Sequence, residues 1–409
     1  MTISRMAEFL KESPTLCLNQ KAAEFKRLGK PIIHLGGGEP KSKAPESAII
    51  ATKNLLNSGE VRYSPASGIP DLKKAVIKYT EKNYFHKFSS ENIIISSGAK
   101  QAIMVALQAI LNPGDEILYP SPYWVSYPEM AIICGAKGIP INTEQNGFIP
   151  KIEDFEKSFN ANTKAVIINS PNNPSGKVYP KEFIRQIIEF CEQKNIYLIM
   201  DDIYNELIFD EKKKVNPLEF VSDLSADSKL IITNGVSKAF AMTGFRIGWA
   251  IANPVLITAM TNIQAHQTSG PSILGQVGAL AALEGEQREI EDLRLNLQHN
   301  RNILLDLLKS IPNIEIIRPE GTFYSFVNFS KIENDSVKLA KLIMDKTFVL
   351  TVPGIDFGSE GYLRISYCGS IEEITEGINR IKWLLDPNSP NEYYLQDRVL
   401  VKDNQLIGI

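Results

Sequence analysis

Between about Asn92 and Asn253 the sequence alternates short β-branched runs with longer amphipathic segments. This alternation is typical of α/β proteins, in which a helix connects one strand to the next. The runs are almost wholly apolar rather than alternating, which indicates a mostly parallel sheet with helices on both faces. The expected strands are 93–96, 116–119, 165–169, 196–200, 230–233 and 247–252.

Helical periodicity separates these runs and continues after them. The expected helices are 100–111, 180–194, 255–265, 284–309 and 336–346. We predict a large domain at 46–285 and a smaller α+β domain at 286–385, with 1–45 as the N-terminal segment of the smaller domain. Residues 386–409 show little periodicity and are expected to form a C-terminal tail.

Composition excludes several classes of function. Among 409 residues, 44 Lys and Arg face 47 Asp and Glu, a net charge of −3 that leaves no basic excess for nucleic acid. The N-terminus has charged residues in every turn, and no later stretch reaches 18 uncharged apolar residues, so neither a signal peptide nor a membrane span is expected. The four cysteines form no Cys-x-x-Cys pair and indicate reduced thiols in a cytoplasmic protein, and the four histidines lack metal-ligand spacing, so no metal is expected.

Candidate ligand-binding residues follow four of the expected strands. In an open parallel sheet, ligands bind beyond the carboxyl ends of the strands, so these residues are expected to lie together. They are Gly98, Ala99 and Lys100 after the first strand, Asn172 and Asn173 after the third, Asp201 and Tyr204 after the fourth, and Lys238 and Arg246 after the fifth.

Each of these features also has a purely structural explanation. Gly98-Ala99-Lys100 can be a turn, the SPNNPSG segment a rigid loop, and Asp201 the N-cap of a helix. Lys238 can be a solvated charge, and Arg246 can form a surface ion pair worth under about 1 kcal/mol. Their coincidence at one sheet edge favours a ligand site.

One cofactor needs this combination of groups. A helix N-terminus binds a phosphate, a lysine amine condenses with an aldehyde, and an acid pairs with a pyridine nitrogen. These are the requirements of pyridoxal phosphate. Asp201 is suited to the last role, because a carboxylate about 4 Å from a pyridinium gains roughly 4 kcal/mol at an effective dielectric constant near 20.

The motifs together resemble those of class I aminotransferases, a family of fold-type I pyridoxal phosphate enzymes. The matching segments extend over nearly the whole chain: GGGEP, YSPASGIPDLKKA, SSGAKQA, SPYWVSYPEM, SPNNPSG, MDDIYNEL, SKAFAMTGFRIGWA and LRISY. The resemblance implies an α/β fold with a seven-stranded, mostly parallel sheet and a smaller α+β domain. It also implies pyridoxal phosphate as cofactor and a ping-pong transfer of an amino group from an L-amino acid to a 2-oxo acid.

The resemblance further implies roles for individual residues. Lys238 would hold the cofactor as a Schiff base and move the substrate proton, Asp201 would pair with the ring nitrogen, and Tyr204 and Asn173 would donate to its phenolic oxygen. The remaining cofactor contacts would be Trp124 on the ring face, and Gly98, Ala99, Lys100, Ser237 and Arg246 around the phosphate. Gly235 stands where family members often have a serine, which leaves one phosphate contact open.

Tyr63 resembles the tyrosine that reaches the phosphate of a neighbouring subunit, which implies a homodimer with shared active sites. The alternative is an aromatic residue packed in a turn. Arg364 would bind the substrate α-carboxylate together with the Gly38 backbone N–H, and Trp124 and Asn173 would also border the substrate.

Lys100 and Thr15 resemble residues of the bacterial aspartate and prephenate aminotransferases. Their presence favours aspartate or glutamate as amino donor, whereas prephenate, a broader specificity, or a β-lyase reaction on the same fold are the alternatives. A transcription regulator is disfavoured because the 45 residues before the large domain are not basic enough. The segment Lys41-Ser42-Lys43 departs from the Asp-Phe that close relatives have after GEP.

Overall fold

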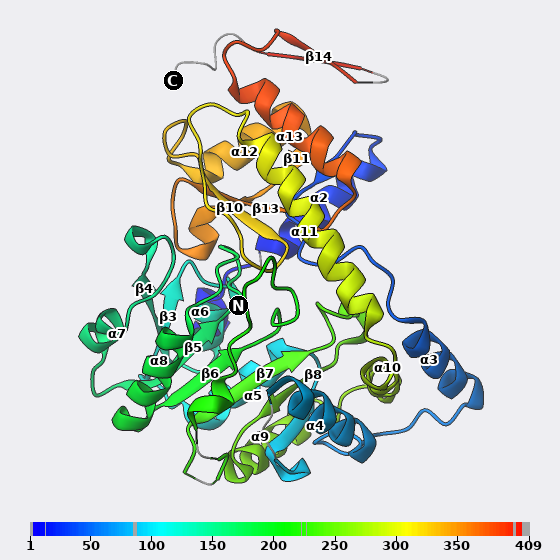
Figure 1. Cartoon of the computed structure of the whole chain (residues 1–409), viewed down its shortest axis with the longest axis vertical. Helices are drawn as coiled ribbons and strands as arrows, with labels where there is room; N and C mark the ends of the chain where they lie inside the picture. The colour runs from blue at the N-terminus through cyan, green and yellow to red at the C-terminus, as the bar shows by residue number, and fades with distance from the viewer. Residues whose placement is uncertain are drawn as a thin grey trace.

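The computed structural model describes residues 3–12, 14–84, 88–221, 223–225, 227–395 and 398–402, and its centre is a seven-stranded sheet (Figure 1). The strand order is β2-β8-β7-β6-β5-β3-β4, and only β8 is antiparallel to its neighbours. The strands are β2 (Ile93–Ser96), β3 (Glu116–Ser121), β4 (Lys137–Asn142), β5 (Thr163–Asn169), β6 (Tyr197–Asp201), β7 (Leu230–Gly235) and β8 (Gly248–Ile251).

The predicted α/β fold and all six expected strands are confirmed. Strand β4 was missed. It lies at the edge of the sheet, contains Pro140, and buries only Ile141. A proline is tolerated at a sheet edge, but it removes the apolar run that marks an interior strand.

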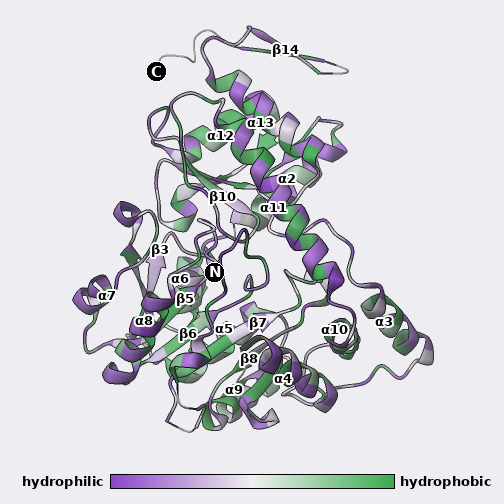
Figure 2. Cartoon of the chain, in the orientation of Figure 1, coloured by the Kyte–Doolittle hydropathy of each residue, from purple (hydrophilic) through white to green (hydrophobic). Residues whose placement is uncertain are grey.

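Helices cover both faces of this sheet. Successive residues of β2 enter opposite cores: Ile93 and Ile95 pack with α4, α8 and α10, whereas Ile94 packs with α5, α6 and α9. The helices of this region are α3 (Glu46–Ser58), α4 (Pro70–Tyr84), α5 (Ala99–Ile110), α6 (Ser126–Ile133), α7 (Ile152–Ser158), α8 (Lys181–Lys194), α9 (Pro254–Gln267) and α10 (Ile273–Glu284). Figure 2 shows the contrast between hydrophobic interior strands and the hydrophilic outer helix α7.

A second, smaller core surrounds an antiparallel sheet with the order β12-β13-β10-β9. A parallel pair of β1 (Ile33–His34) and β11 (Val349–Leu350) attaches the N-terminal segment to the C-terminal region. The other elements are α1 (Arg5–Phe9), α2 (Pro14–Arg27), β9 (Glu315–Ile316), β10 (Tyr324–Asn328), β12 (Val352–Pro353), β13 (Tyr362–Ser366), α11 (Arg288–Leu308), α12 (Ser336–Thr347) and α13 (Ile371–Leu385). The domain boundaries after residues 45, 285 and 385 stay a prediction.

The expected C-terminal tail contains a hairpin of β14 (Glu392–Tyr394) and β15 (Val399–Val401). Trp383 anchors it, because its indole N–H donates to the Pro390 carbonyl at 2.8 Å and its ring lies 5.6 Å from that of Tyr393. Strands of three residues are too short for a readable period. Residues 403–409 lie outside the described chain. Within the described residues, no helix combines the length and apolar character needed to cross a membrane.

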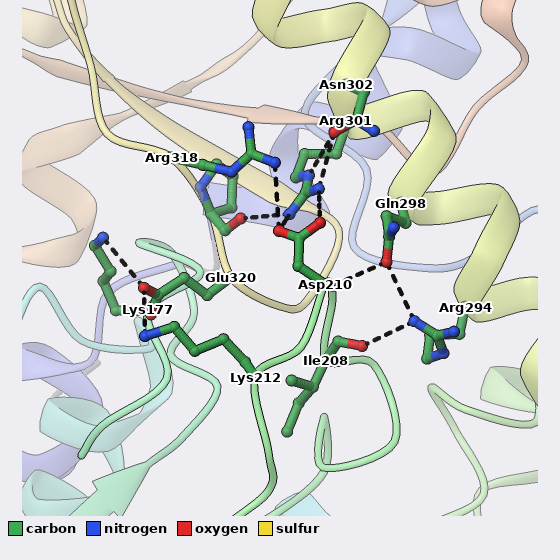
Figure 3. Close-up of polar contacts among 11 residues, drawn as sticks. Lys177, Ile208, Asp210, Lys212, Arg294, Gln298, Arg301, Asn302, Arg318 and Glu320 are labelled. Atoms are coloured by element: carbon green, nitrogen blue, oxygen red, sulfur yellow. Dashed lines mark hydrogen bonds and ion pairs between the residues drawn. The ribbon is translucent and has the colours of Figure 1, made fainter.

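A buried arginine connects α11 to the loop that follows β6 (Figure 3). Arg301 is fully buried, and its two terminal nitrogens donate to the Asp210 carboxylate at 2.9 Å each. The Asp210 backbone N–H donates to Gln298 of α11 at 3.0 Å. Arg301 also donates to the Pro319 carbonyl at 3.1 Å, just before β10. This contact network holds the loop after β6, and therefore Tyr204, against the smaller sheet.

Asp210→Asn should lower the free energy of unfolding by about 3 kcal/mol, because it leaves the buried Arg301 charge without its partner. Asparagine tolerates the positive φ of 57° at this position, so the backbone is not strained by the change. The control, Arg318→Ala, removes an exposed partner of Asp210 and should cost under about 1 kcal/mol. Urea denaturation measures both changes, and equal small losses would contradict the role of Arg301.

Candidate active site

A cavity of about 400 Å³ lies at the carboxyl ends of β5, β6 and β7. It forms where these parallel strands end side by side, which is where the sequence placed a ligand site. The predicted site residues that line it are Gly38, Ala99, Lys100, Trp124, Asn173, Asp201, Tyr204, Ser237, Lys238, Arg246 and Arg364.

Four predicted residues are not in this lining. Gly98 lies directly beside it, because a Cβ at Gly98 would come 2.6 Å from the Arg246 Nη2 atom. Tyr63 is 94% exposed and lies away from the cavity of its own chain. Thr15 belongs to α2, and its side chain lies outside the described part of the structure. Asn172 is buried in the loop after β5, where its amide donates to the Pro122 carbonyl.

Lys238 lies in the loop that follows β7. Its Nζ atom donates to the Gly38 carbonyl at 2.5 Å. Burial lowers the pKa of Lys238 to about 8, and the positive charge of Arg364 acts in the same direction. A larger fraction of this amine is therefore neutral at physiological pH than for an ordinary lysine, whose pKa is about 10.4.

Asp201 is the last residue of β6. Its carboxylate accepts hydrogen bonds from the Tyr127 hydroxyl at 2.7 Å and the Ile203 backbone N–H at 3.4 Å. Burial raises the pKa of Asp201 to about 6, although both hydrogen bonds oppose the rise. A cationic group facing this carboxylate would restore its charged form.

The N-terminus of α5 forms one wall of the site. Its N-cap, Gly98, has a φ of 88°, and Arg246 lies beside it with Nη1 donating to the Thr243 carbonyl at 2.8 Å. A Cβ at Gly248 would lie 2.3 Å from the Ala99 nitrogen, so only glycine permits this approach. Free N–H groups, a helix dipole and a guanidinium suit a phosphate.

The close packing around Gly235 explains why a glycine stands where family members often have a serine. A Cβ at this position would lie 2.8 Å from both the Gly248 Cα atom and the Ile247 carbonyl oxygen. A serine side chain therefore does not fit between β7 and β8 here. Ser237, which lines the cavity, is the nearest hydroxyl in the sequence before Lys238.

Arg364 lies in β13 and is 2% exposed. Its Nη1 donates to the Asn173 side-chain oxygen at 3.0 Å, and its Nη2 donates to the Gly36 carbonyl at 3.1 Å. The guanidinium carbon lies 4.2 Å from the centre of the Tyr324 ring. Its Nε has no hydrogen-bond partner among the described residues. A buried, held guanidinium with an unmet donor suits a carboxylate ligand.

Lys100 lies at the cavity margin with its Nζ 4.9 Å from the centre of the Trp124 ring. Burial lowers the pKa of Lys100, and Arg246 adds to this effect. Among the described lining residues, Lys100, Lys238, Arg246 and Arg364 are basic, whereas Glu39 and Asp201 are acidic. This excess of positive charge favours anionic ligands.

Sequence reasoning missed four residues that build the site. Tyr127 donates to Asp201, Tyr324 packs on Arg364, and Asn19 lines the cavity. Asn169 donates to the Asp201 carbonyl at 2.8 Å and also lines the cavity. Only Asn169 carried a readable signal, since it ends an expected strand. In the described part of the chain, no group of three or more His, Cys, Asp or Glu side chains is placed to hold a metal ion.

This fold and this site define a pyridoxal-phosphate-dependent aminotransferase. The chain belongs to the family "Aminotransferase class I and II", whose sequence profile matches residues 30–381. Within that family it is aspartate aminotransferase-like and falls in the group of bacterial aspartate and aspartate/prephenate aminotransferases.

Individual relatives support this placement. The chain is 34% identical to aspartate aminotransferase of Bacillus subtilis over 395 residues, which cover 95% of this chain and 100% of the relative. It is 34% identical to aspartate/prephenate aminotransferase of Thermus thermophilus over 387 residues, covering 94% and 98%. The solved structure of Thermus thermophilus aspartate aminotransferase with maleate superposes with a TM-score of 0.89 at 34% identity, covering 93% of this chain and 99% of that one.

The residues of the cavity fit the family's cofactor, pyridoxal phosphate. The absence of a Cβ at Gly98 and Gly248 lets Arg246 and the N-terminus of α5 come close together, and this combination of guanidinium and free N–H groups suits the phosphate. The buried Asp201 carboxylate suits a ring cation, and Lys238 is an amine of lowered pKa. The donor set therefore matches phosphate, ring nitrogen and aldehyde.

Borohydride trapping of pyridoxal phosphate on the apoprotein should label Lys238 with a yield that rises through a midpoint near pH 8. The pKa of the lysine is lowered, so its amine loses the proton above about pH 8 and becomes nucleophilic there. Arg364→Met should move the midpoint upward, because it removes a nearby positive charge. Lys238→Ala should lose both the label and turnover. Unchanged trapping in Lys238→Ala, measured by peptide mass spectrometry, would reject the assignment.

Proposed function

We propose that this aminotransferase uses Lys238 as its proton-transferring base and acts on dicarboxylic amino acids. When bound, pyridoxal phosphate supplies a cationic ring that withdraws electrons from the substrate α-carbon. Lys238 Nζ would then take the proton from that carbon and deliver it to the cofactor carbon that carried the aldehyde, so that the amino group passes from the substrate to the cofactor. The lowered pKa of Lys238 supports this role, because a base works best when its pKa lies near the working pH.

The other residues of the cavity hold the cofactor and exclude water. Asp201, kept in place by Tyr127, would face the ring nitrogen. Tyr204 and Asn173 would donate to the phenolic oxygen, and Trp124 would cover the ring face. The phosphate would be held by Gly98, Ala99, the backbone N–H of Lys100, Ser237 and Arg246. These roles rest on the shared cavity lining, the contact of Gly98 with Arg246, and the likeness to the family.

The substrate is held at both ends. Arg364 binds the α-carboxylate in two parallel hydrogen bonds, together with the Gly38 N–H, and so fixes the direction of the Cα–H bond. Lys100 binds the distal carboxylate, with Thr15 on α2. The observation that carries this proposal is the pair of separate cations, Arg364 and Lys100, in one cavity. The names of the relatives support aspartate or glutamate, and prephenate is the second candidate.

Lys100→Ala should lower kcat/KM for aspartate about tenfold and leave alanine nearly unchanged, because only the dicarboxylic donor loses a charge-assisted hydrogen bond. Arg364→Ala should weaken all donors, since every amino acid has an α-carboxylate. A panel of amino donors with 2-oxoglutarate, followed by the absorbance of the donor half-reaction, measures both effects.

Each variant is the control for the other, because Lys100→Ala should affect only dicarboxylic donors and Arg364→Ala should affect every donor. An unchanged preference for aspartate over alanine in Lys100→Ala would refute the proposed substrate class. Release of pyruvate and ammonia from one substrate, without an oxo acid, would instead indicate a β-lyase.

We also propose a homodimer in which Tyr63 completes the site of the partner subunit. Tyr63 is exposed, and so are three apolar residues of α3, Ile49, Ile50 and Leu56. Mixing Tyr63→Ala chains with Lys238→Ala chains should restore activity, because one hybrid site then has both side chains intact. Hybrids without activity, or sedimentation at the mass of one chain, would contradict the shared site.

We also infer that the protein is located in the cytoplasm. This inference is supported by the four cysteines, Cys17, Cys134, Cys191 and Cys368, all of which are free thiols. Cell fractionation with antibody detection tests it, and recovery outside the cytoplasm would contradict it.

A further inference from the structure

A hydrogen-bonded chain connects α2 to the substrate cavity. The His34 Nε2 atom lies 2.7 Å from the Asn19 side-chain oxygen, and His34 Nδ1 accepts the Gly36 backbone N–H at 3.2 Å. The Gly36 carbonyl in turn accepts from Arg364. Asn19 lines the same cavity as Arg364 and Lys100. Asn19 and His34 have no role in the reaction described above.

The position of one proton follows from these contacts. A backbone N–H can only donate, so the Nδ1 atom of His34 must be the acceptor and the Nε2 atom must hold the ring proton. The Nε2–H group therefore donates to the Asn19 oxygen. This arrangement fixes the orientation of the Asn19 amide, whose nitrogen forms no hydrogen bond with any described residue.

The surroundings of His34 keep its ring neutral. Burial lowers the pKa of His34, and the positive charges of Lys41 and Arg364 lower it further, whereas Glu373 and Glu39 act in the opposite direction. Because burial has the largest effect, the neutral tautomer with the proton on Nε2 is favoured at neutral pH.

We propose that the Asn19 amide nitrogen donates a hydrogen bond to the side-chain carboxylate of the substrate, and that His34 is a positioning residue that holds Asn19 in this orientation. The inference rests on the proposed dicarboxylic specificity and deepens it. An amide donor from α2 and the Lys100 ammonium from α5 would then share one distal carboxylate.

The amide orientation provides the selectivity. With its oxygen turned toward His34, Asn19 directs its N–H donors to the cavity, and these bind a carboxylate or carbonyl oxygen but not an ammonium group. A donor amino acid with an apolar side chain gains nothing from Asn19. Asn19 therefore separates dicarboxylic from monocarboxylic amino acids without affecting the α-carboxylate contact.

Three α2 variants of the holoenzyme test this role. Asn19→Ala removes the donor and should lower kcat/KM for aspartate in the half-reaction about tenfold, mainly through KM, with alanine unchanged. Asn19→Asp keeps the acceptor for His34 but replaces the donor with a negative charge. This variant should lower kcat/KM for aspartate about a hundredfold. Gln20→Ala is the matched control, because Gln20 is exposed on the same helix and does not line the cavity.

Binding gives a second readout that does not depend on turnover. Succinate, an unreactive dicarboxylate, should bind Asn19→Ala about tenfold more weakly than the unchanged protein in calorimetry, and Gln20→Ala should bind it equally well.

Two substitutions of His34 separate positioning from general stability. His34→Gln places an amide near the Nε2 position and can still donate to Asn19, whereas His34→Asn places an acceptor near Nδ1 and retains only the Gly36 contact. We expect the aspartate-to-alanine ratio to fall more in His34→Asn than in His34→Gln. Equal loss for all donors in both variants would show a merely structural histidine and overturn its positioning role.

The outcomes distinguish this inference from the proposal beneath it. If the enzyme without substitutions prefers aspartate, and Asn19→Ala has the same aspartate-to-alanine preference and the same succinate affinity, the role of Asn19 alone is overturned. An unchanged enzyme with no preference for dicarboxylic donors overturns the proposed substrate class, and the role of Asn19 with it.

Discussion

The parallel register of three neighbouring strands determines where the chemistry takes place. Asn169 of β5 is paired with Asp201 of β6, and Asp201 is paired with Thr233 of β7, so β5 and β6 end at the same level and β7 ends two residues later. The backbone then turns away in three loops, and each loop supplies a side chain to the same cavity. A shift of one residue would turn Asp201 to the opposite face of the sheet.

Burial shifts the pKa values of both Lys238 and Asp201, and in both cases it disfavours the charged form. The buried position that lowers the pKa of Lys238 raises that of Asp201, so each charged form depends on the groups around it. Tyr127 partly compensates the carboxylate, and the Gly38 carbonyl partly compensates the amine. The segment 36–38 thereby contacts both Lys238, in the loop after β7 of the large sheet, and Arg364, in β13 of the smaller sheet.

The sequence predicted those features that depend on local pattern. Lys238 and Asp201 follow apolar strands, and the position of each strand was readable. Strand β4 was not readable, because Pro140 and its exposed neighbours remove the apolar run. Tyr127, His34 and Asn19 meet their partners only through folding, so no spacing revealed them. The proposed role of Tyr63 depends on a second chain, whose position one sequence does not give.

The arrangement around Arg364 has a consequence for how tightly the empty enzyme is organised. Two of its nitrogens donate to Asn173 and Gly36, and its guanidinium carbon lies 4.2 Å from the centre of the Tyr324 ring, so these three contacts fix the side chain in place. The Nε atom is a buried donor without a hydrogen-bond partner among the described residues. Because folding already fixes the side chain, the proposed binding of a carboxylate by Arg364 would cost little further loss of side-chain rotation.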